Sequence, residues 1–297
     1  MSSQKSRPVV SVVRSEGHYK GTENALRVIE DRIEESLMGK RGLVMKPNFV
    51  STSRQLAATH VDSVRAVLDT ITKYYQGGII IAEGPALGSL GSGLSNFGYS
   101  QLEDEYGVEF IDLNSDGYRV LRGVDRRMEP LEFRVSRTIL DSDFLISVVR
   151  PKTHDCVVVT LTIKNVVVGS LVSKREKEKI HQGMRAINLN LAGLAERLMP
   201  DLGVVDGYLG MEGRGPTSGD PVELRVSAAS LHPVSLDAVM AKIMGFEPLD
   251  IGYLYYLNER GVGVAELNGI EVLGTPIDEV GVRFRPHPRI EEQLKWR

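Results

Sequence analysis

Residues 144–149, Phe-Leu-Ile-Ser-Val-Val, run directly into residues 150–154, Arg-Pro-Lys-Thr-His. The apolar run is typical of a buried strand, and the basic and polar residues would then stand at its carboxyl end. Open α/β sheets bind ligands just outside the carboxyl ends of their strands. This segment therefore predicts a sheet with buried strands and a ligand site at one edge of that sheet.

Similar apolar runs alternate with helical patterns along the chain. Strands are predicted at residues 9–13, 43–45, 79–82, 108–111 and 202–205, and helices at residues 25–37, 61–71, 186–199 and 236–244. Such alternation predicts an α/β fold, a largely parallel sheet flanked by helices. We expect a single domain over residues 8–275, or two lobes that meet near residues 120–140 with the site between them. Residues 276–297 are expected to form a peripheral tail.

Two segments of the second half stand out by composition. Residues 157–168 are long, apolar and rich in β-branched side chains, which predicts a buried segment with β character. Residues 173–179, Ser-Lys-Arg-Glu-Lys-Glu-Lys, are too charged for a core, so we expect a solvated surface or a mobile lid.

Composition limits the partners and cofactors. The net charge of −3 argues against nonspecific nucleic-acid binding, which depends on neutralising phosphates. A single cysteine, Cys156, excludes an intrachain disulfide and a four-cysteine iron–sulfur cluster built from this chain alone. We expect Cys156 to be an apolar strand residue. Neither an apolar signal region nor a membrane-length apolar run is present, which favours a cytoplasmic protein with no membrane partner.

Several predicted strands end in charged or amide residues rather than in simple turn residues. Because the carboxyl ends of parallel strands meet at one edge, we expect these side chains to converge on a ligand site. The alternative is that each ending is an ordinary turn. The residues concerned are Lys46 and Asn48, Glu83, Lys152 and His154, and Asp206.

Lys164 and His60 add to this candidate site. Lys164 interrupts an apolar stretch, and an unpaired buried ammonium is costly, so it must snorkel, meet an anion or lose its proton. His60 follows Thr59, a predicted helix cap, and the helix dipole would keep its ring neutral. The loop at residues 206–220 holds five glycines, and its Gly213-Arg214-Gly215 could present backbone N–H groups and charge to an anion.

At these residues the chain resembles domain-of-unknown-function family 362. The matching segments span nearly the whole chain: Lys46-Pro47-Asn48, Thr59-His60, Ala82-Glu83-Gly84, Pro151-Lys152-Thr153-His154, Lys164-Asn165 through Gly169, His181, Asp206-Gly207, Met211 through Pro216, and Asp237. Many relatives carry a cysteine-rich ferredoxin-like segment. With one cysteine, this chain lacks that module, so no electron-transfer role is carried over.

A looser similarity is to the N-terminal domain of nickel-dependent lactate racemases. Those enzymes use two histidines as acid and base, a lysine that holds a nickel pincer nucleotide, and a later histidine as nickel ligand. Here His60, His154, Lys164 and His181 occur in that order, with spacings like those of the racemases. The similarity indicates where the site lies rather than what it holds.

Two hypotheses of function follow. The first is an enzyme, racemase-like or metal-assisted, that acts on a small anionic substrate or a nucleotide-like cofactor. The second is a non-catalytic binding or delivery protein for an anionic ligand or cofactor. In the first, the catalytic residues are His60, His154 and Lys164. The binding residues are Lys46, Asn48, Lys152, Asn165, Gly213, Arg214 and Gly215. A divalent metal would be held by His181 with Glu83, Asp206 or Glu212.

Overall fold

An eight-stranded sheet organises residues 7–297, the part of the chain that the computed structural model describes. Seven of its strands run parallel, and only β13 runs against its neighbours. This confirms the predicted α/β fold with a largely parallel sheet. In spatial order the strands are β14 (Glu271–Gly274), β1 (Val9–Arg14), β13 (Val226–Ser230), β10 (Leu202–Gly207), β7 (Phe144–Val149), β2 (Leu43–Lys46), β3 (Ile79–Glu83) and β4 (Glu109–Asp112).

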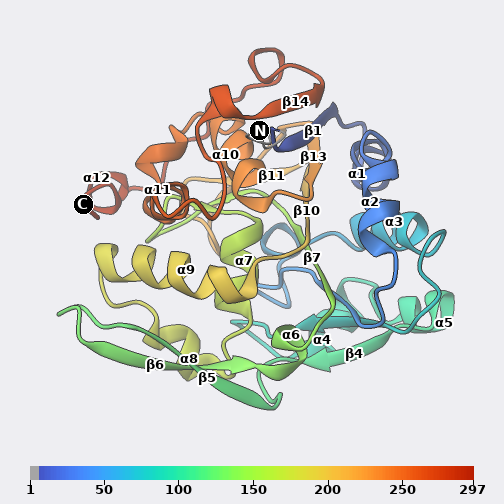
Figure 1. The fold of residues 1–297 in the computed structure, drawn as a ribbon, viewed down its shortest axis with the longest axis horizontal. Coiled ribbons are helices and arrows are strands. Elements are labelled where there is room, and N and C mark those ends of the chain that lie inside the picture. The colour runs from blue at the N-terminus through green and yellow to red at the C-terminus, as the bar shows by residue number, and fades with distance from the viewer. Residues whose placement is uncertain (1–6) are drawn as a thin grey trace, which may run out of the picture.

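Helices cover both faces of this sheet, as Figure 1 shows. One face packs against α1 (His18–Arg27), α2 (Glu30–Leu37) and α3 (Val61–Ile71). The other packs against α7 (Thr162–Gly169), α9 (Met184–Leu198) and α10 (Pro233–Ile243). We call these the α3 face and the α7 face. Because side chains alternate along a strand, Val148 of β7 joins the α3-face core and Val149 joins the α7-face core.

Smaller elements surround the sheet. A four-stranded sheet continues from the carboxyl ends of β7 and β10; it contains β8 (Lys152–Thr153), β9 (Val159–Thr160), β11 (Gly210–Glu212) and β12 (Asp220–Val222). A hairpin pairs β5 (Tyr118–Val124) with β6 (Pro130–Ser136). The other α-helices are α4 (Leu90–Asn96), α5 (Gln101–Tyr106), α6 (Arg137–Leu140), α8 (Lys174–Lys179), α11 (Gly252–Glu259) and α12 (Ile290–Gln293). Within residues 7–297 no helix combines the length and the apolar character needed to cross a membrane.

Residues 157–168 are not the long β segment that their composition predicts. Only Val159 and Thr160 form a strand, and α7 begins at Thr162. The cause is distant in sequence: the buried Asp237 carboxylate accepts the Thr162 N–H at 2.9 Å and the Ile163 N–H at 3.1 Å. These bonds satisfy backbone N–H groups that have no partner within the helix at its first turn. The core on the α7 face then buries Val166 and Val167 of this helix.

Two other helix predictions are corrected in detail. The pattern at residues 25–37 belongs to two helices, because α1 ends at Arg27 and α2 begins at Glu30. The cap of α3 is His60, whose ring accepts the Asp62 N–H, rather than Thr59. The Thr59 hydroxyl instead donates to the Val148 carbonyl at 2.8 Å, which ties the start of α3 to β7.

Residues 276–297 run along the surface but are anchored in the interior. Phe284, Gln293 and Trp296 are each at most 2% exposed. Gln293 accepts a hydrogen bond from the Val158 N–H at 2.7 Å and donates to the His154 carbonyl at 2.8 Å. The segment thus supports the loop that carries His154. The division of the chain at residues 275 and 276 stays a prediction.

Candidate functional site

A cavity of about 290 Å³ opens at the carboxyl ends of the parallel strands, beside α7 and α8. Six residues that the sequence nominates line it, together with four further charged residues. The nominated ones are Asn48, Glu83, His154, Lys164, Asn165 and His181, and the additional ones are Asp155, Lys174, Lys177 and Glu178.

Lys46 and Lys152 lie below this cavity rather than in its wall. The Lys46 ammonium donates to Glu83 and, at 3.2 Å, to the Asn165 side-chain oxygen. Lys152 donates to the Asn48 side-chain oxygen at 2.5 Å. Both lysines are completely buried, and burial holds the pKa of Lys152 well below its usual range. The sequence predicts both as ligand-binding residues, but the structure pairs them with protein groups that position Asn48 and Asn165.

The position of Lys46 in this network also explains why residue 169 is a glycine. A β-carbon at this position would lie 2.1 Å from Cε and 2.3 Å from Nζ of Lys46. A side chain at this position would therefore displace the end of Lys46 from its bond with Glu83, which favours glycine as the last residue of α7.

Lys164 is the one lysine of this group without a protein partner. It projects from α7 and is 8% exposed, yet no hydrogen bond or ion pair joins its ammonium to another of residues 7–297. Burial lowers the pKa of Lys164 to about 8. The lysine thus offers an unpaired ammonium to the cavity that it lines.

Lys177 is a site residue that sequence reasoning missed. The charged run 173–179 forms α8, and α8 buries Glu176 and Lys177. Glu176 accepts the Arg134 N–H of β6, while Lys177 donates to Asn114 and lines the cavity. Burial lowers the pKa of Lys177 to about 8. The expectation that no part of this run is buried is wrong, since a short helix can turn two charges inward; the lid motion stays a prediction.

The two histidines of the cavity are held in opposite tautomers. His181 Nδ1 lies 2.9 Å from the Lys177 carbonyl, which only accepts, so this nitrogen carries the proton and Nε2 is free to accept. His154 Nδ1 lies 3.0 Å from an Asp155 carboxylate oxygen, but the hydrogen bond it makes is with the Cys156 N–H at 3.0 Å, which only donates, so the ring proton is assigned to Nε2. Burial, with Lys164 nearby, holds the pKa of His154 well below its usual range. Partial burial and Lys164 also lower the pKa of His181.

His60 does not share this cavity. Its ring stacks on His18 with the ring centroids 4.0 Å apart, and His18 bonds Asp206 at 2.7 Å. These residues belong to α1, α3 and the end of β10, on the α3 face, whereas Lys164 lies on the α7 face. The expectation of one pocket that holds both His60 and His154 is corrected, because strand endings deliver side chains to both faces of the sheet.

The glycine-rich loop has a structural explanation that does not involve a ligand. A β-carbon on Gly215 would lie 2.1 Å from the Thr153 carbonyl oxygen, and Thr153 donates to the Gly213 carbonyl at 3.0 Å. Arg214 is exposed, and only Pro216 and Thr217 of this loop line the cavity. Close packing against β8 therefore accounts for Gly215, and a left-handed backbone with φ near +73° accounts for Gly213.

Of the four expected metal ligands, the structure brings Glu83 and His181 to the wall of the cavity and places Asp206 and Glu212 elsewhere. Glu83 is paired with Lys46, Asp206 lies on the α3 face, and Glu212 accepts the Arg285 N–H at 2.9 Å. Of these four residues, His181 is the one that lines the cavity with a donor atom, Nε2, not engaged by another group of residues 7–297.

Within residues 7–297 one other group could hold a metal, the adjacent His154, Asp155 and Cys156. In that group His154 Nδ1 is engaged, and burial raises the pKa of the Cys156 thiol to about 12. Cys156 lies in a turn rather than a strand. Neither set presents the three or four free donors that a bound divalent ion needs.

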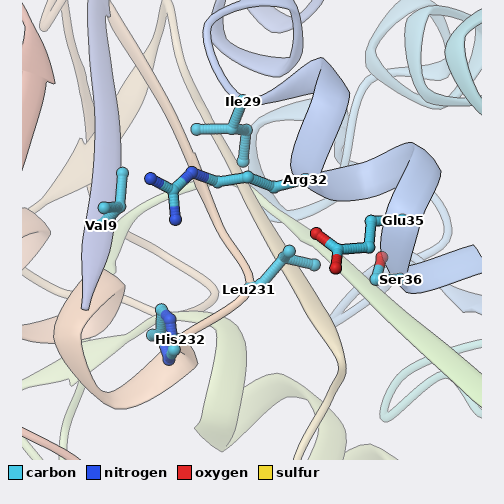
Figure 2. A pocket seen from close by; sticks show the side chains of 7 residues that line it. All are labelled: Val9, Ile29, Arg32, Glu35, Ser36, Leu231 and His232. Carbon is cyan, nitrogen blue, oxygen red and sulfur yellow. The ribbon is translucent and has the colours of Figure 1, made fainter. Parts of the chain in front are cut away.

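Other hollows lie at the opposite edge of the sheet. One of about 230 Å³ lies beside α2 and the first residue of β1, where Arg32, Glu35 and His232 line it with apolar neighbours (Figure 2). Figure 2 shows the His232 ring at a distance from the Glu35 carboxylate. The charged residues of this hollow, Arg32 and Glu35, both come from α2.

Comparison with known proteins places the chain in a family. The profile described as "Domain of unknown function (DUF362)" matches residues 43–242. The chain belongs to the DUF362 family. It is similar to the "Thylakoid-associated protein sll1697" of Synechocystis sp., with 26% identity over 214 residues that cover 70% of this chain and 64% of that protein. The chain therefore spans slightly under two thirds of the length of that relative.

A solved structure shares the fold. The lactate racemase apoprotein from Thermoanaerobacterium thermosaccharolyticum superposes with a TM-score of 0.52 at 16% identity. The match covers 77% of this chain and 55% of the racemase. At this identity the likeness shows a common α/β architecture.

Proposed function

We propose that this DUF362 protein is an enzyme that binds a small anionic substrate in the cavity beside α7 and moves a proton with His181, assisted by a hydrogen bond from His154. One observation carries the proposal: two neutral histidines with opposite tautomers line the same cavity. His181 can take a proton through Nε2, while neutral His154 can donate a hydrogen bond through Nε2 to negative charge that develops on the substrate. A base beside a fixed hydrogen-bond donor suits a reaction in which His181 removes a proton from the substrate and returns it, such as an isomerisation or racemisation.

The lysines supply the charge that would hold the substrate. Lys164 has no protein partner, and Lys177 reaches the cavity past Gly84, where a β-carbon would lie 2.9 Å from its Nζ. An anion between these ammonium groups would offset the free energy lost by burying them. Lys46 and Lys152 stand behind this pair and keep Asn48 and Asn165 oriented.

A binding protein is the competing function, because Lys164 and Lys177 would serve it equally well. The two proposals differ over the histidines. An enzyme needs the donor on His154 and the acceptor on His181, whereas a binder needs only the charge. Fold similarity to a lactate racemase supports a catalytic use of such a cavity without assigning the same substrate.

Deuterium exchange separates the two functions. The protein would be incubated in D₂O with single enantiomers of small 2-hydroxy and 2-amino carboxylates, and deuterium at C2 would be followed by NMR. We expect exchange with the wild type and a loss of about 100-fold or more in His154→Gln and His181→Gln. His232→Gln, at the opposite edge of the sheet, is the matched control and should retain full activity. Saturable binding by calorimetry without exchange, unchanged in both site variants, would instead identify a binding protein.

A further inference from the structure

A second polar cluster lies on the α3 face, at the same edge of the sheet as the cavity. Val149 pairs with Val205 in the parallel register of β7 and β10, so Arg150 and Asp206 follow at matching positions. Strand alternation places both on the side of Val148 and Val204, which belong to the α3-face core. His18, His60 and Ser63 join them from α1 and α3.

The Asp206 carboxylate in this cluster accepts three hydrogen bonds. It accepts hydrogen bonds from His18 Nδ1 at 2.7 Å, from the Ser63 hydroxyl at 2.5 Å and from the Tyr208 N–H at 3.2 Å. Burial opposes its ionisation, but these donors keep the pKa of Asp206 below its usual value. None of the three donors is Arg150.

Arg150 is left without an acceptor. Its side chain is among the largest fully buried ones, with the residue 2% exposed. Its Nε and Nη2 are buried without a hydrogen-bond partner among residues 7–297, and no carboxylate lies within ion-pair distance of it there. A guanidinium keeps its proton at every physiological pH, so the charge persists, and Asp206 compensates it only at longer range than a hydrogen bond or ion pair. Burying such a charge without a partner is strongly unfavourable.

We infer that Arg150 anchors a second binding site, for a carboxylate or phosphoryl oxyanion, on the α3 face. The planar guanidinium fork matches two oxygens of either group. The stacked rings of His18 and His60 are the part of the cluster that reaches solvent, with side chains 14% and 28% exposed. His18 Nδ1 is bonded to Asp206 and His60 Nδ1 to the Asp62 N–H, so the Nε2 atoms of the two rings are the ones left to contact an anion that reaches Arg150 from this side.

This site is separate from the cavity beside α7. His18, His60, Arg150 and Asp206 are all absent from the wall of that cavity. The two clusters take their side chains from opposite faces of the sheet, so a ligand of one does not touch the other. The inference therefore stands whether or not the proposed proton-transfer function is correct.

Histidine-selective ¹³C labelling tests the inference directly, because the chain has only six histidines. Inorganic phosphate and acetate would each be titrated at constant ionic strength, with resonances assigned from His18→Gln and His60→Gln. We expect the His18 and His60 resonances to shift saturably in the wild type and in Lys164→Met. In Arg150→Met the apparent affinity for the anion should fall at least tenfold. In Arg150→Lys, which keeps the positive charge but loses the planar guanidinium, the affinity should fall by a smaller factor.

The titrations also assign the ligand class, since tighter binding of phosphate or of acetate identifies a phosphoryl or a carboxylate group. Unchanged His18 and His60 resonances in the wild type with both anions would overturn the inference, and so would equal shifts in Arg150→Met. If Arg150→Met and Arg150→Lys do not fold, the wild-type titration decides alone. Shifts that disappear in Lys164→Met would assign the anion to the cavity and would likewise overturn a separate site.

Discussion

The carboxamide of Gln293 donates a hydrogen bond to the carbonyl of His154 over 2.8 Å, although 139 residues separate them in the chain. The same side chain accepts the Val158 N–H at 2.7 Å. Val158 has φ near +66°, a conformation that a β-branched residue adopts only when its surroundings impose it. Gln293 thus holds a strained loop that presents His154 to the cavity.

Replacing Gln293 with alanine should therefore loosen the His154 loop. Two buried backbone groups would lose their partners, so we expect the free energy of unfolding to fall by about 1–3 kcal/mol. Amide hydrogen exchange at Val158 should accelerate strongly in the variant. Glu291→Ala, on the exposed side of α12, is the control and should leave both quantities unchanged. Unaltered protection of Val158 in Gln293→Ala would contradict this role.

Breaking the buried Lys46–Glu83 pair should be strongly destabilising. Lys46→Met leaves the Glu83 carboxylate, which is 2% exposed, without its main partner, and the expected cost is roughly 3–5 kcal/mol. Glu83→Gln strands the ammonium in the same way. The double variant should cost less than the sum of the two, because neither charge remains. Denaturant unfolding of all four proteins measures this coupling, and simple additivity would show that the pair does not act as a unit.

Lys164→Met should behave in the opposite way, since the ammonium it removes has no protein partner. We expect the variant to unfold at an equal or higher denaturant concentration than the wild type. It should also lose the anion-dependent stabilisation that the cavity provides. A loss of several kcal/mol in ligand-free Lys164→Met would point to a buried carboxylate partner and would remove Lys164 from the proposed anion site.

The pH dependence of stability provides an independent check on the same lysine. In the folded protein the pKa of Lys164 is about 8, whereas in the unfolded chain a lysine titrates near 10.4. Between these values the unfolded state binds more protons, so stability rises as pH increases from about 8 to 10. The contribution amounts to roughly 3 kcal/mol at about 1.4 kcal/mol per pKa unit.

Urea unfolding at pH 7 and pH 9.5 would measure this gain. The wild type should gain more stability than Lys164→Met over that interval. Lys177, whose pKa is also about 8, contributes a similar rise that persists in Lys164→Met. Identical pH profiles for the two proteins would show that Lys164 is not desolvated.

Much of the fold was predictable because local patterns agree with it. Alternating strand and helix periodicities located β2, β3, β7, β10, α9 and α10 to within a few residues. Of the residues at the strand endings, Asn48, Glu83 and His154 line one cavity, while their predicted role in ligand binding stays a prediction. Lys177 was not predicted as a cavity residue, because the sequence of a charged helix does not show whether all of its side chains are exposed or one of them is buried.

Sequence alone determined that this chain forms an α/β sheet whose strands end in charged groups at a common edge. Only the tertiary structure decided on which face of the sheet each of these side chains lies. Lys46 joins Asn165 on the α7 face, while Asp206 joins His18 on the α3 face. The physical reason is that a strand alternates faces at every residue, so a shift of one position moves a side chain to the other side of the sheet. The helix start at Thr162 depends likewise on Asp237, 75 residues away, which no local pattern can anticipate.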